Sequence, residues 1–498
     1  MRRDIRVGLH AAGEAADGWR RVLRQDRLPW APCEGASPHV ITVFDGALPA
    51  WCDDYVAQGG VAVISGAPRA DDLLGPSRTA TIHRFRPPGR DREAALPCLA
   101  RIFEGEGEGE IRLHENRKAR DGRLADVRAA MLVRPHGAGW LVYTGLPLAT
   151  HLAAVGDTLR TFTTASNVTE RVASVDKAEV ADAMTAMLMR AFALRSLPFL
   201  RIARYPGAAP SVFLLRVDVD GLFGDRCQAI ANVAAAHGIG ASFYFNASLC
   251  RAHPGAVSRD WRDAHEIAHH GDVHDLFDTV DENRTNLLGG IDWVEQRFGL
   301  RPTGYVAPRG LWNAALDQAL AELGHTYSAD FGLDFDSAPF FTPEGILQIP
   351  VHPFSPERLA VHQEDAGVGP PDAAVLHHYR TALDRQVAAR RPAQLYGHPE
   401  VLGRMASAVL PALFESVRSH GLPTMTLAAF AHWWIARDAS ELGLTLDEAT
   451  GTVHAQTDGH ALEAYAAEGG RVVLDGSAHD LEAGRWTVLF RSDEAPHD

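Results

Sequence analysis

The central part of the chain alternates short apolar runs with stretches that repeat apolar residues at helical spacing. The apolar runs predict strands at 212–219, 241–245, 266–269, 304–306, 326–329, 346–351, 394–396 and 423–425. The stretches between them predict helices near 225–236, 284–298, 313–323, 372–390, 405–420 and 427–438. Repeated strand–helix units indicate a parallel barrel or a doubly wound sheet. In either fold, catalytic groups lie at the carboxyl ends of the strands.

The segments on both sides of this region follow other patterns. Residues 39–44 and 61–64 are apolar runs around a short amphipathic stretch at 50–58, which is typical of half a Rossmann-like α/β unit. Residues 178–197 have helical periodicity, and 442–491 alternate between turn signals, as in a small antiparallel β domain. We therefore predict an α/β domain, a linker helix, a central barrel and a β domain at 1–170, 171–200, 201–440 and 441–498.

Charge and composition limit which binding partners and which cellular location we expect for the protein. Of the 498 residues, 63 are acidic and 48 basic, and this formal net charge of -15 argues against binding to nucleic acid or anionic membranes. No run of about 18 apolar residues occurs, so we expect no membrane span. The start of the chain has no apolar segment of the signal-peptide kind, which favours a cytoplasmic location. The five cysteines are widely spaced, with neither a disulfide pattern nor a cysteine zinc motif.

Residues 265–274, which read H-E-I-A-H-H-G-D-V-H, hold two overlapping histidine pairs. His265 and His269 flank a glutamate as in the H-E-x-x-H motif of zinc proteases, whereas His270 and His274 form a second pair four residues apart. With 24 histidines in the chain, about one pair at this spacing is expected by chance. The spacing alone therefore does not distinguish a metal site from coincidence.

Two carboxylates occur at the end of the apolar strand at 212–219. Asp218 and Asp220 are two residues apart, so a strand places both on one face. Carboxylates at the exit of a buried strand are costly unless a positive group compensates them. We expect a metal ion or a basic side chain there, and the alternative is that Asp218 caps the following helix.

Five motifs occur in order along the barrel region. They are D-V-D-G at 218–221, G-A-S-F-Y-F at 240–245, E-I-A-H-H-G-D-V-H at 266–274, P-T-G-Y-V-A-P-R-G at 302–310 and L-Y-G-H-P at 395–399. The series resembles the polysaccharide deacetylase family (NodB homology, carbohydrate esterase family 4) and covers about 205–435. The resemblance implies an incomplete (β/α) barrel of NodB type that uses a metal ion to remove N-acyl groups from amino sugars.

The resemblance also implies roles for individual residues. Asp220, His270 and His274 would be the metal ligands, Asp218 the catalytic base and His398 the general acid. Three protein ligands leave an open position for water, as in catalytic zinc sites. We therefore expect a divalent metal of the zinc type, with cobalt, nickel, manganese and iron as alternatives.

The third motif departs from the family pattern. Family members place an arginine two residues before the proline, where it pairs with the catalytic base, but that position is Val306 here and Arg309 follows Pro308. We expect Arg309 either to pair with Asp218 and keep it ionised or to bind an anionic group of the substrate.

Three further residues are candidates for the pocket. Trp312 could stack on a sugar ring or belong to the core. Asp330 is the nearest match to the fourth family motif and could orient a histidine or bind sugar hydroxyls. His352, in the sequence I-P-V-H-P, is a second candidate for the acid or for the pocket lining.

The N-terminal pattern offers a second, fainter resemblance. The strand, helix and strand within 39–66 are similar to class I glutamine-amidotransferase-like domains, in which a helix also ends in Gly-Gly before a strand. The strained nucleophile turn of those enzymes is missing, and Cys52 falls inside the predicted helix. We therefore predict an amidotransferase-like domain without a nucleophile.

The sequence favours a hydrolase that removes an acetyl or formyl group from an amino sugar or glycan precursor. An allantoinase-like amidohydrolase acting on a small non-sugar amide is one alternative. A non-catalytic, glycan-binding scaffold is another, although the retained Asp, His and His argue against it. A zinc protease is disfavoured, because Gly271 soon interrupts any helix and because Asp218, Asp220 and His398 would have no role.

Overall fold

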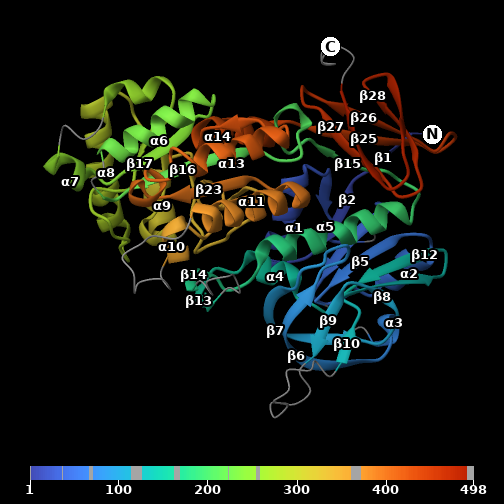
Figure 1. Ribbon diagram of the computed structural model, residues 1–498. Helices are drawn as coiled ribbons and strands as arrows, with labels where there is room; N and C mark the ends of the chain where they lie inside the picture. Colours follow the sequence, from blue (N-terminus) through green and yellow to red (C-terminus); the bar gives the residue numbers. More distant parts are fainter. Residues whose placement is uncertain are drawn as a thin grey trace. The chain divides into compact units, whose positions relative to one another are not determined.

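The computed structural model describes residues 2–35, 37–66, 71–113, 126–161, 169–221, 224–253, 258–360 and 372–490. The chain divides into two compact units (Figure 1). The barrel unit comprises Gly156–Ala173 and Arg204–Ala436, and the flanking unit comprises Met1–Val155, Ser174–Ala203 and Arg437–Asp498. Within the described ranges, no helix is long and apolar enough to cross a membrane.

The barrel unit is built on one nine-stranded sheet, in the order β21-β22-β20-β19-β18-β17-β16-β23 with β24 also paired to β16. The pairings are parallel except that of β21 with β22. The strands are β16 (Phe213–Val219), β17 (Ala241–Phe245), β18 (Glu266–His269), β19 (Gly304–Tyr305), β20 (Tyr327–Ser328), β21 (Phe340–Phe341), β22 (Leu347–Gln348), β23 (Ala393–Gly397) and β24 (Thr424–Met425). This sheet confirms the predicted incomplete parallel barrel.

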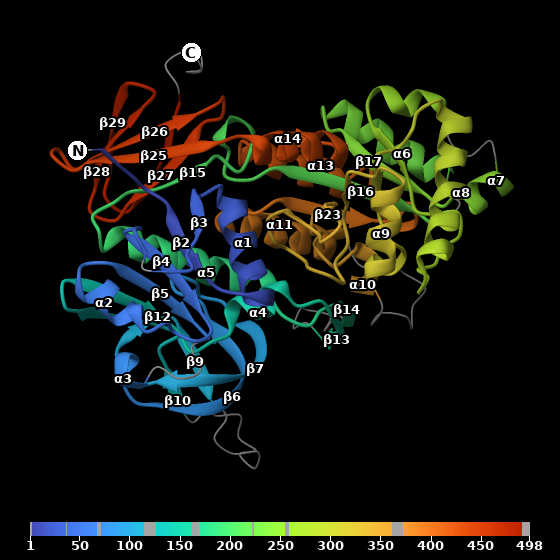
Figure 2. The same ribbon diagram turned by 180° about the vertical axis from the view of Figure 1, so that it is seen from behind.

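Helices surround this sheet in both views (Figure 1; Figure 2). They are α6 (Gly224–Ala236), α7 (Ala247–Ala252), α8 (Val280–Phe298), α9 (Ala314–Glu322), α10 (Pro356–Ala360), α11 (Asp372–Ala389), α12 (Pro399–Leu402), α13 (Val409–Ser419) and α14 (Leu427–Ala439). Residues at both ends of helix α8 fix where the helix begins and ends. The side chain of Thr279 accepts a hydrogen bond from the backbone N–H of Glu282, and Gly299 ends the helix at φ 70°.

The register of the sheet brings three strand ends to one edge. Val219, the last residue of β16, pairs with Phe245 of β17, which in turn pairs with His269 of β18. Every residue of β16 and β17 is buried, as expected for strands inside a parallel sheet. The residues that directly follow β16 and β18, Asp220 and His270, therefore emerge beside each other.

A hairpin that precedes the predicted barrel in the sequence also belongs to the barrel unit. It consists of β13 (Asp157–Thr161) and β14 (Thr169–Ala173). The backbone N–H of Ala173 donates to the carbonyl oxygen of Phe331 at 3.2 Å. The predicted boundary between residues 170 and 171 thus runs through a strand, and helix α5 (Lys177–Ala193), predicted as the linker, lies in the flanking unit.

The flanking unit contains a seven-stranded sheet in the order β3-β2-β4-β5-β12-β11-β8, parallel from β3 to β12. The strands are β2 (Val7–His10), β3 (Trp30–Pro32), β4 (Ile41–Asp45), β5 (Val61–Ser65), β8 (Gly107–Glu108), β11 (Met131–His136) and β12 (Gly139–Tyr143). Helix α2 (Trp51–Ala57) connects β4 to β5, as predicted. Cys52 lies buried inside α2, and this burial raises the pKa of its thiol to about 12, which is unsuited to a nucleophile.

The C-terminal segment forms strands as expected, and two of them also pair with strands from earlier in the chain. The strands are β25 (Leu442–Asp447), β26 (Thr452–Thr457), β27 (Leu462–Ala466), β28 (Gly470–Leu474), β29 (Ser477–Leu481) and β30 (Arg485–Leu489). Strand β25 pairs with β1 (Arg2–Asp4), and β27 pairs with β15 (Phe199–Ile202). Strands β26 and β28 are parallel, so the segment is not purely antiparallel.

Candidate metal centre

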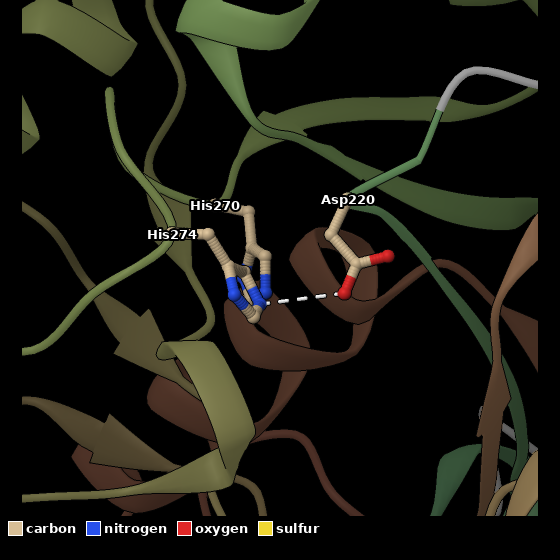
Figure 3. Close-up of side chains that lie close together, drawn as sticks. All are labelled: Asp220, His270 and His274. Carbon is tan, nitrogen blue, oxygen red and sulfur yellow. Dashed lines mark ion pairs between the residues drawn. The ribbon is translucent and has the colours of Figure 1, made fainter.

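Asp220, His270 and His274 converge at the carboxyl edge of the sheet (Figure 3). One possible ligand atom from each lies within 4.8 Å of the others, and this is the single group of three or more such residues in the described part of the chain. Nε2 of His274 is 3.3 Å from Oδ2 of Asp220. One carboxylate and two imidazoles are a donor set suited to zinc and related divalent ions.

The imidazole of His270 is held in one tautomer. Its Nδ1 lies 2.7 Å from the carbonyl oxygen of Val306, and because that oxygen can only accept, Nδ1 carries the proton. The lone pair of Nε2 is then free for a metal ion. Burial lowers the pKa of His270 to about 3, and burial also lowers the pKa of His274. Both rings are therefore neutral, as metal ligands must be.

Asp218 is paired with Arg216, two residues earlier on β16. Nε and Nη2 of Arg216 each lie 2.6 Å from one of the two carboxylate oxygens of Asp218. Both side chains are almost completely buried, at 1% and 4% exposure. Burial acts to raise the pKa of Asp218, but the charge and hydrogen bonds of Arg216 outweigh it and hold the pKa below its usual value. Asp218 is therefore ionised at neutral pH.

Arg309 does not form the pair with Asp218 that was one of its two expected roles. Its side chain is 61% exposed, and its nearest carboxylate partner is Asp275, with Nη1 3.8 Å from Oδ1. Arg216 takes the place of the family arginine instead. The sequence held a signal for it, because the alternation in R-V-D-V-D puts residues 216, 218 and 220 on one face of the strand.

His398 lies between Asp220 and Glu357. Its Nδ1 is 3.2 Å from Oε2 of Glu357, and its Nε2 is 3.6 Å from Oδ2 of Asp220. Burial acts to lower the pKa of His398, but the hydrogen bond and charge of Glu357, together with the charges of Asp220 and Asp218, raise it to about 9. His398 is therefore protonated at neutral pH. Glu357, on α10, was not found from the sequence, because its contact depends on how α10 packs beside the end of β23.

These residues line one cavity of about 310 Å³, at the small end of the range for small-molecule sites. All five residues predicted as ligands, base and acid are in its lining, and so are Arg216, Glu357, Arg309 and Arg358. The acid, the base and the metal ligands thus face the same space.

The other predicted pocket residues lie elsewhere. Asp330 is fully buried, and its Oδ1 accepts a hydrogen bond from the backbone N–H of Ala307 at 2.8 Å, which fixes the loop after β19. Nδ1 of His352 lies 3.0 Å from Asp336, and its Nε2 lies 3.2 Å from Nε2 of His378. Neither residue lines the cavity, and neither does Trp312.

The alternative H-E-x-x-H pair does not form a metal site. His265 accepts from the backbone N–H of Ala241 at 3.1 Å through Nδ1, and its Nε2 lies 3.1 Å from the carbonyl oxygen of Ala231. Nε2 of His269 lies 2.9 Å from Nε2 of His325. Both histidines are buried, and His269 lies on β18, a strand rather than the helix that a zinc protease needs.

Residues 210–328 match the family model of polysaccharide deacetylases. This segment is a polysaccharide deacetylase domain. Members of this family are usually metal-dependent deacetylases, although the family also includes pseudoenzymes, and the cluster of Asp220, His270 and His274 could hold such a metal. The match does not extend to the N-terminal region. The amidotransferase-like domain there stays a prediction from the sequence.

The chain is also similar to several solved structures. A candidate polysaccharide deacetylase from Mycobacterium smegmatis is 21% identical, with a TM-score of 0.41, over 47% of this chain and 93% of that one. PuuE allantoinase is 19% identical, with a TM-score of 0.39, over 47% and 93%. Agd3, described as a carbohydrate deacetylase, is 10% identical, with a TM-score of 0.40, over 98% of both chains. No curated protein matches the chain.

Proposed function

We propose that this protein is a metal-dependent hydrolase that removes an N-acetyl or N-formyl group from an amino sugar or glycan precursor. One observation carries the proposal. One cavity is lined by three residues that could hold a metal ion, by the ionised carboxylate of Asp218 and by the protonated imidazole of His398. These are the groups that amide hydrolysis by activated water requires.

The residues present fit a divalent ion. Asp220 supplies an oxygen, and His270 and His274 supply neutral imidazole nitrogens, with Nε2 of His270 freed by the bond from Nδ1 to Val306. When bound, the ion supplies Lewis acidity that polarises the acyl carbonyl and acidifies water. Zinc is the metal we expect for this donor set, and the same donors also accept cobalt, nickel, manganese or iron.

Asp218 acts as the general base. Arg216 keeps its carboxylate ionised and, through two parallel hydrogen bonds, fixes its orientation. The carboxylate accepts a proton from the attacking water as the new C–O bond forms. Since Arg216 is itself fixed by a hydrogen bond to the carbonyl oxygen of Ala329, the base is held in place before substrate binds.

His398 acts as the general acid. Glu357 contacts its Nδ1, which leaves Nε2 to face Asp220 and the cavity. The proton on Nε2 passes to the amine nitrogen as the C–N bond breaks, so the products are a free amine and a carboxylic acid. A positioned acid and base of this kind each contribute about 10²–10⁴-fold to rate.

The two buried pairs argue for an active enzyme over a binding scaffold. Arg216 with Asp218 and Glu357 with His398 place charged groups in a largely buried site, where desolvation is costly. A scaffold that only held glycans would gain nothing from that cost. The cytoplasmic location remains a prediction from the sequence.

The test is hydrolysis by the purified, metal-loaded protein of N-acetyl and N-formyl amino sugars and of small cyclic amides, with products identified by mass spectrometry. We expect acetate or formate from an amino sugar, and an Asp218→Asn variant that keeps its metal but loses about 10²–10⁴-fold in kcat. Asp281→Asn, at a side chain 88% exposed in the same unit, is the matched control. Release from no sugar at all, or full activity in Asp218→Asn, would contradict the proposal.

A further inference from the structure

Arg358 is one of three arginines in the cavity lining, with Arg216 and Arg309, and it is paired with a buried carboxylate. Its Nε lies 2.7 Å from Oε2 of Glu170. The side chain of Glu170 is only 8% exposed, whereas that of Arg358 is 45% exposed. An arginine carries five N–H donors in a planar fork. The pair with Glu170 engages the Nε donor, and Arg358 also lines the cavity.

Glu170 is itself fixed, because it lies in β14 of the hairpin that packs on the barrel. Its neighbours Val172 and Ala173 are buried in a cluster with Phe331 and Tyr396, both of which line the cavity. The carbonyl oxygen of Ala173 also accepts a hydrogen bond from Nη1 of Arg160 at 3.0 Å. The hairpin therefore packs against two residues of the cavity wall, and its Glu170 orients Arg358 before any ligand binds, which lowers the entropy cost of binding.

Arg309 adds a second positive charge at the cavity. Its approach to Asp275 is 3.8 Å, and both side chains are more than half exposed, at 61% and 56%. An exposed pair at that distance contributes little, so Asp275 does not neutralise Arg309 to any great extent. A guanidinium fork matches the geometry of carboxylate and phosphate oxygens.

The acidic groups of the cavity are mostly committed to other partners. Asp218 is paired with Arg216, Glu357 with His398, and Asp220 belongs to the metal site. Glu400 also lines the cavity, but its side chain lies on the exposed surface. A chain with a formal net charge of -15 repels anions at long range, so an anionic substrate would need local arginines such as these.

We propose that the substrate bears an oxyanion, a carboxylate or a phosphate, on the same sugar unit as the acylated amine. Arg358 binds this group and determines specificity, and Arg309 assists it. The inference rests on the proposed function and names the substrate class of the same site. Glu170 is a positioning residue that acts through Arg358.

Calorimetry on metal-loaded Asp218→Asn protein tests binding without turnover. The probes are N-acetylglucosamine, N-acetylglucosamine 6-phosphate and N-acetylglucosaminuronic acid, so that the phosphate and the carboxylate are distinguished. We expect one anionic sugar to bind about tenfold or more tightly than the neutral sugar. Adding Arg358→Gln should reduce that affinity to the level of the neutral sugar. Arg301→Gln, at an arginine that is 54% exposed and paired with Glu295 at 2.9 Å, is the matched control and should leave it unchanged.

Equal affinity for all three sugars, or an anion preference that survives Arg358→Gln, would overturn the inference. Measuring acetate release by the wild-type protein tests the proposed hydrolase separately from the anion site. If neutral and anionic sugars are hydrolysed with equal kcat/KM, the hydrolase stands and the anion site does not. If the anionic sugars bind through Arg358 but none of the sugars is hydrolysed, the anion site stands and the hydrolase does not.

Discussion

Asp218 owes its ionised state to Arg216. Burial alone would raise the pKa of this carboxyl, and the arginine reverses the shift. Replacing Arg216 with Gln should therefore raise the pKa of Asp218, because burial then acts without the opposing charge. Because the base must be ionised, the acidic limb of the kcat/KM profile should move to higher pH. A pH–rate profile measures this shift.

Arg216→Lys is the companion variant, because it keeps the charge but loses the two-pronged contact. It should shift the acidic limb less than Arg216→Gln. Circular dichroism shows whether each variant is folded, since removing one partner of a buried pair costs about 3–5 kcal/mol. A folded Arg216→Gln protein with an unchanged acidic limb would show that Arg216 does not set the charge of the base.

Glu357 raises the pKa of the general acid His398, whereas Arg216 lowers the pKa of the base. Burial alone would lower the pKa of His398. Glu357 makes the largest contribution among the groups that raise this pKa to about 9. In Glu357→Gln the pKa should fall. The acid must be protonated, so the alkaline limb of the kcat/KM profile should move to lower pH, by about one unit or more. Glu415→Gln, at a glutamate 60% exposed in the same unit, should leave the limb in place. An unmoved limb in Glu357→Gln would exclude this role.

Five site residues could be predicted from the sequence because each lies at or just past a strand end, where a parallel sheet gathers its functional groups. Asp218 is the next-to-last residue of β16 and Asp220 directly follows it, His270 and His274 follow β18, and His398 follows β23. Arg216 was accessible from the same alternation but was overlooked. Glu357 was not accessible, because no sequence spacing connects the start of α10 to the end of β23.

The turn after β19 shows how an element shapes the cavity. Gly310 has φ 62°, and a Cβ there would lie 2.3 Å from the ring of Phe331, which lines the cavity. Gly310→Ala should displace this ring, lower kcat/KM and cost about 1–3 kcal/mol from crowding in addition to the backbone strain. Urea unfolding and steady-state kinetics measure the two effects.

Gly324 provides the matched control for this prediction. It has φ 77°, and nothing lies within 4 Å of its Cβ position. Gly324→Ala should therefore carry only the strain of a left-handed residue, about 1–2 kcal/mol, with little effect on kcat/KM. Equal losses of stability and activity in the two variants would show that contact with Phe331 plays no part.

At the scale of elements, strands within apolar runs were predictable even when short, as for β19, β20, β22 and β24, whereas elements without a periodic apolar signal were not. Strand β16 is apolar except for Arg216 and Asp218 and is buried throughout, as expected for a strand inside a parallel sheet. The two-residue strand β21 gives no periodic signal. The hairpin of β13 and β14 reads D-T-L-R-T and T-E-R-V-A, and only its packing on Phe331 shows that it belongs to the barrel unit.

The chain as a whole was predicted as four consecutive domains. In the structure it divides into two units, and each unit is built from stretches that are not consecutive in the sequence. In the flanking unit, Arg201 on β15 binds Asp26 at 3.0 Å and Glu463 at 2.7 Å, with all three side chains buried. This network joins residues that are 175 and 262 positions apart. Such contacts between distant segments leave no local pattern, so the domain borders could not be read from the sequence.

Metal content of the purified protein tests the central claim most directly. By mass spectrometry of the bound metal, the wild-type protein should hold about one divalent ion per chain. His270→Ala and His274→Ala should lose this ion, whereas His265→Ala and His269→Ala, which change buried histidines outside the cluster, should retain it. Loss of the metal in the second pair of variants but not in the first would contradict the assignment.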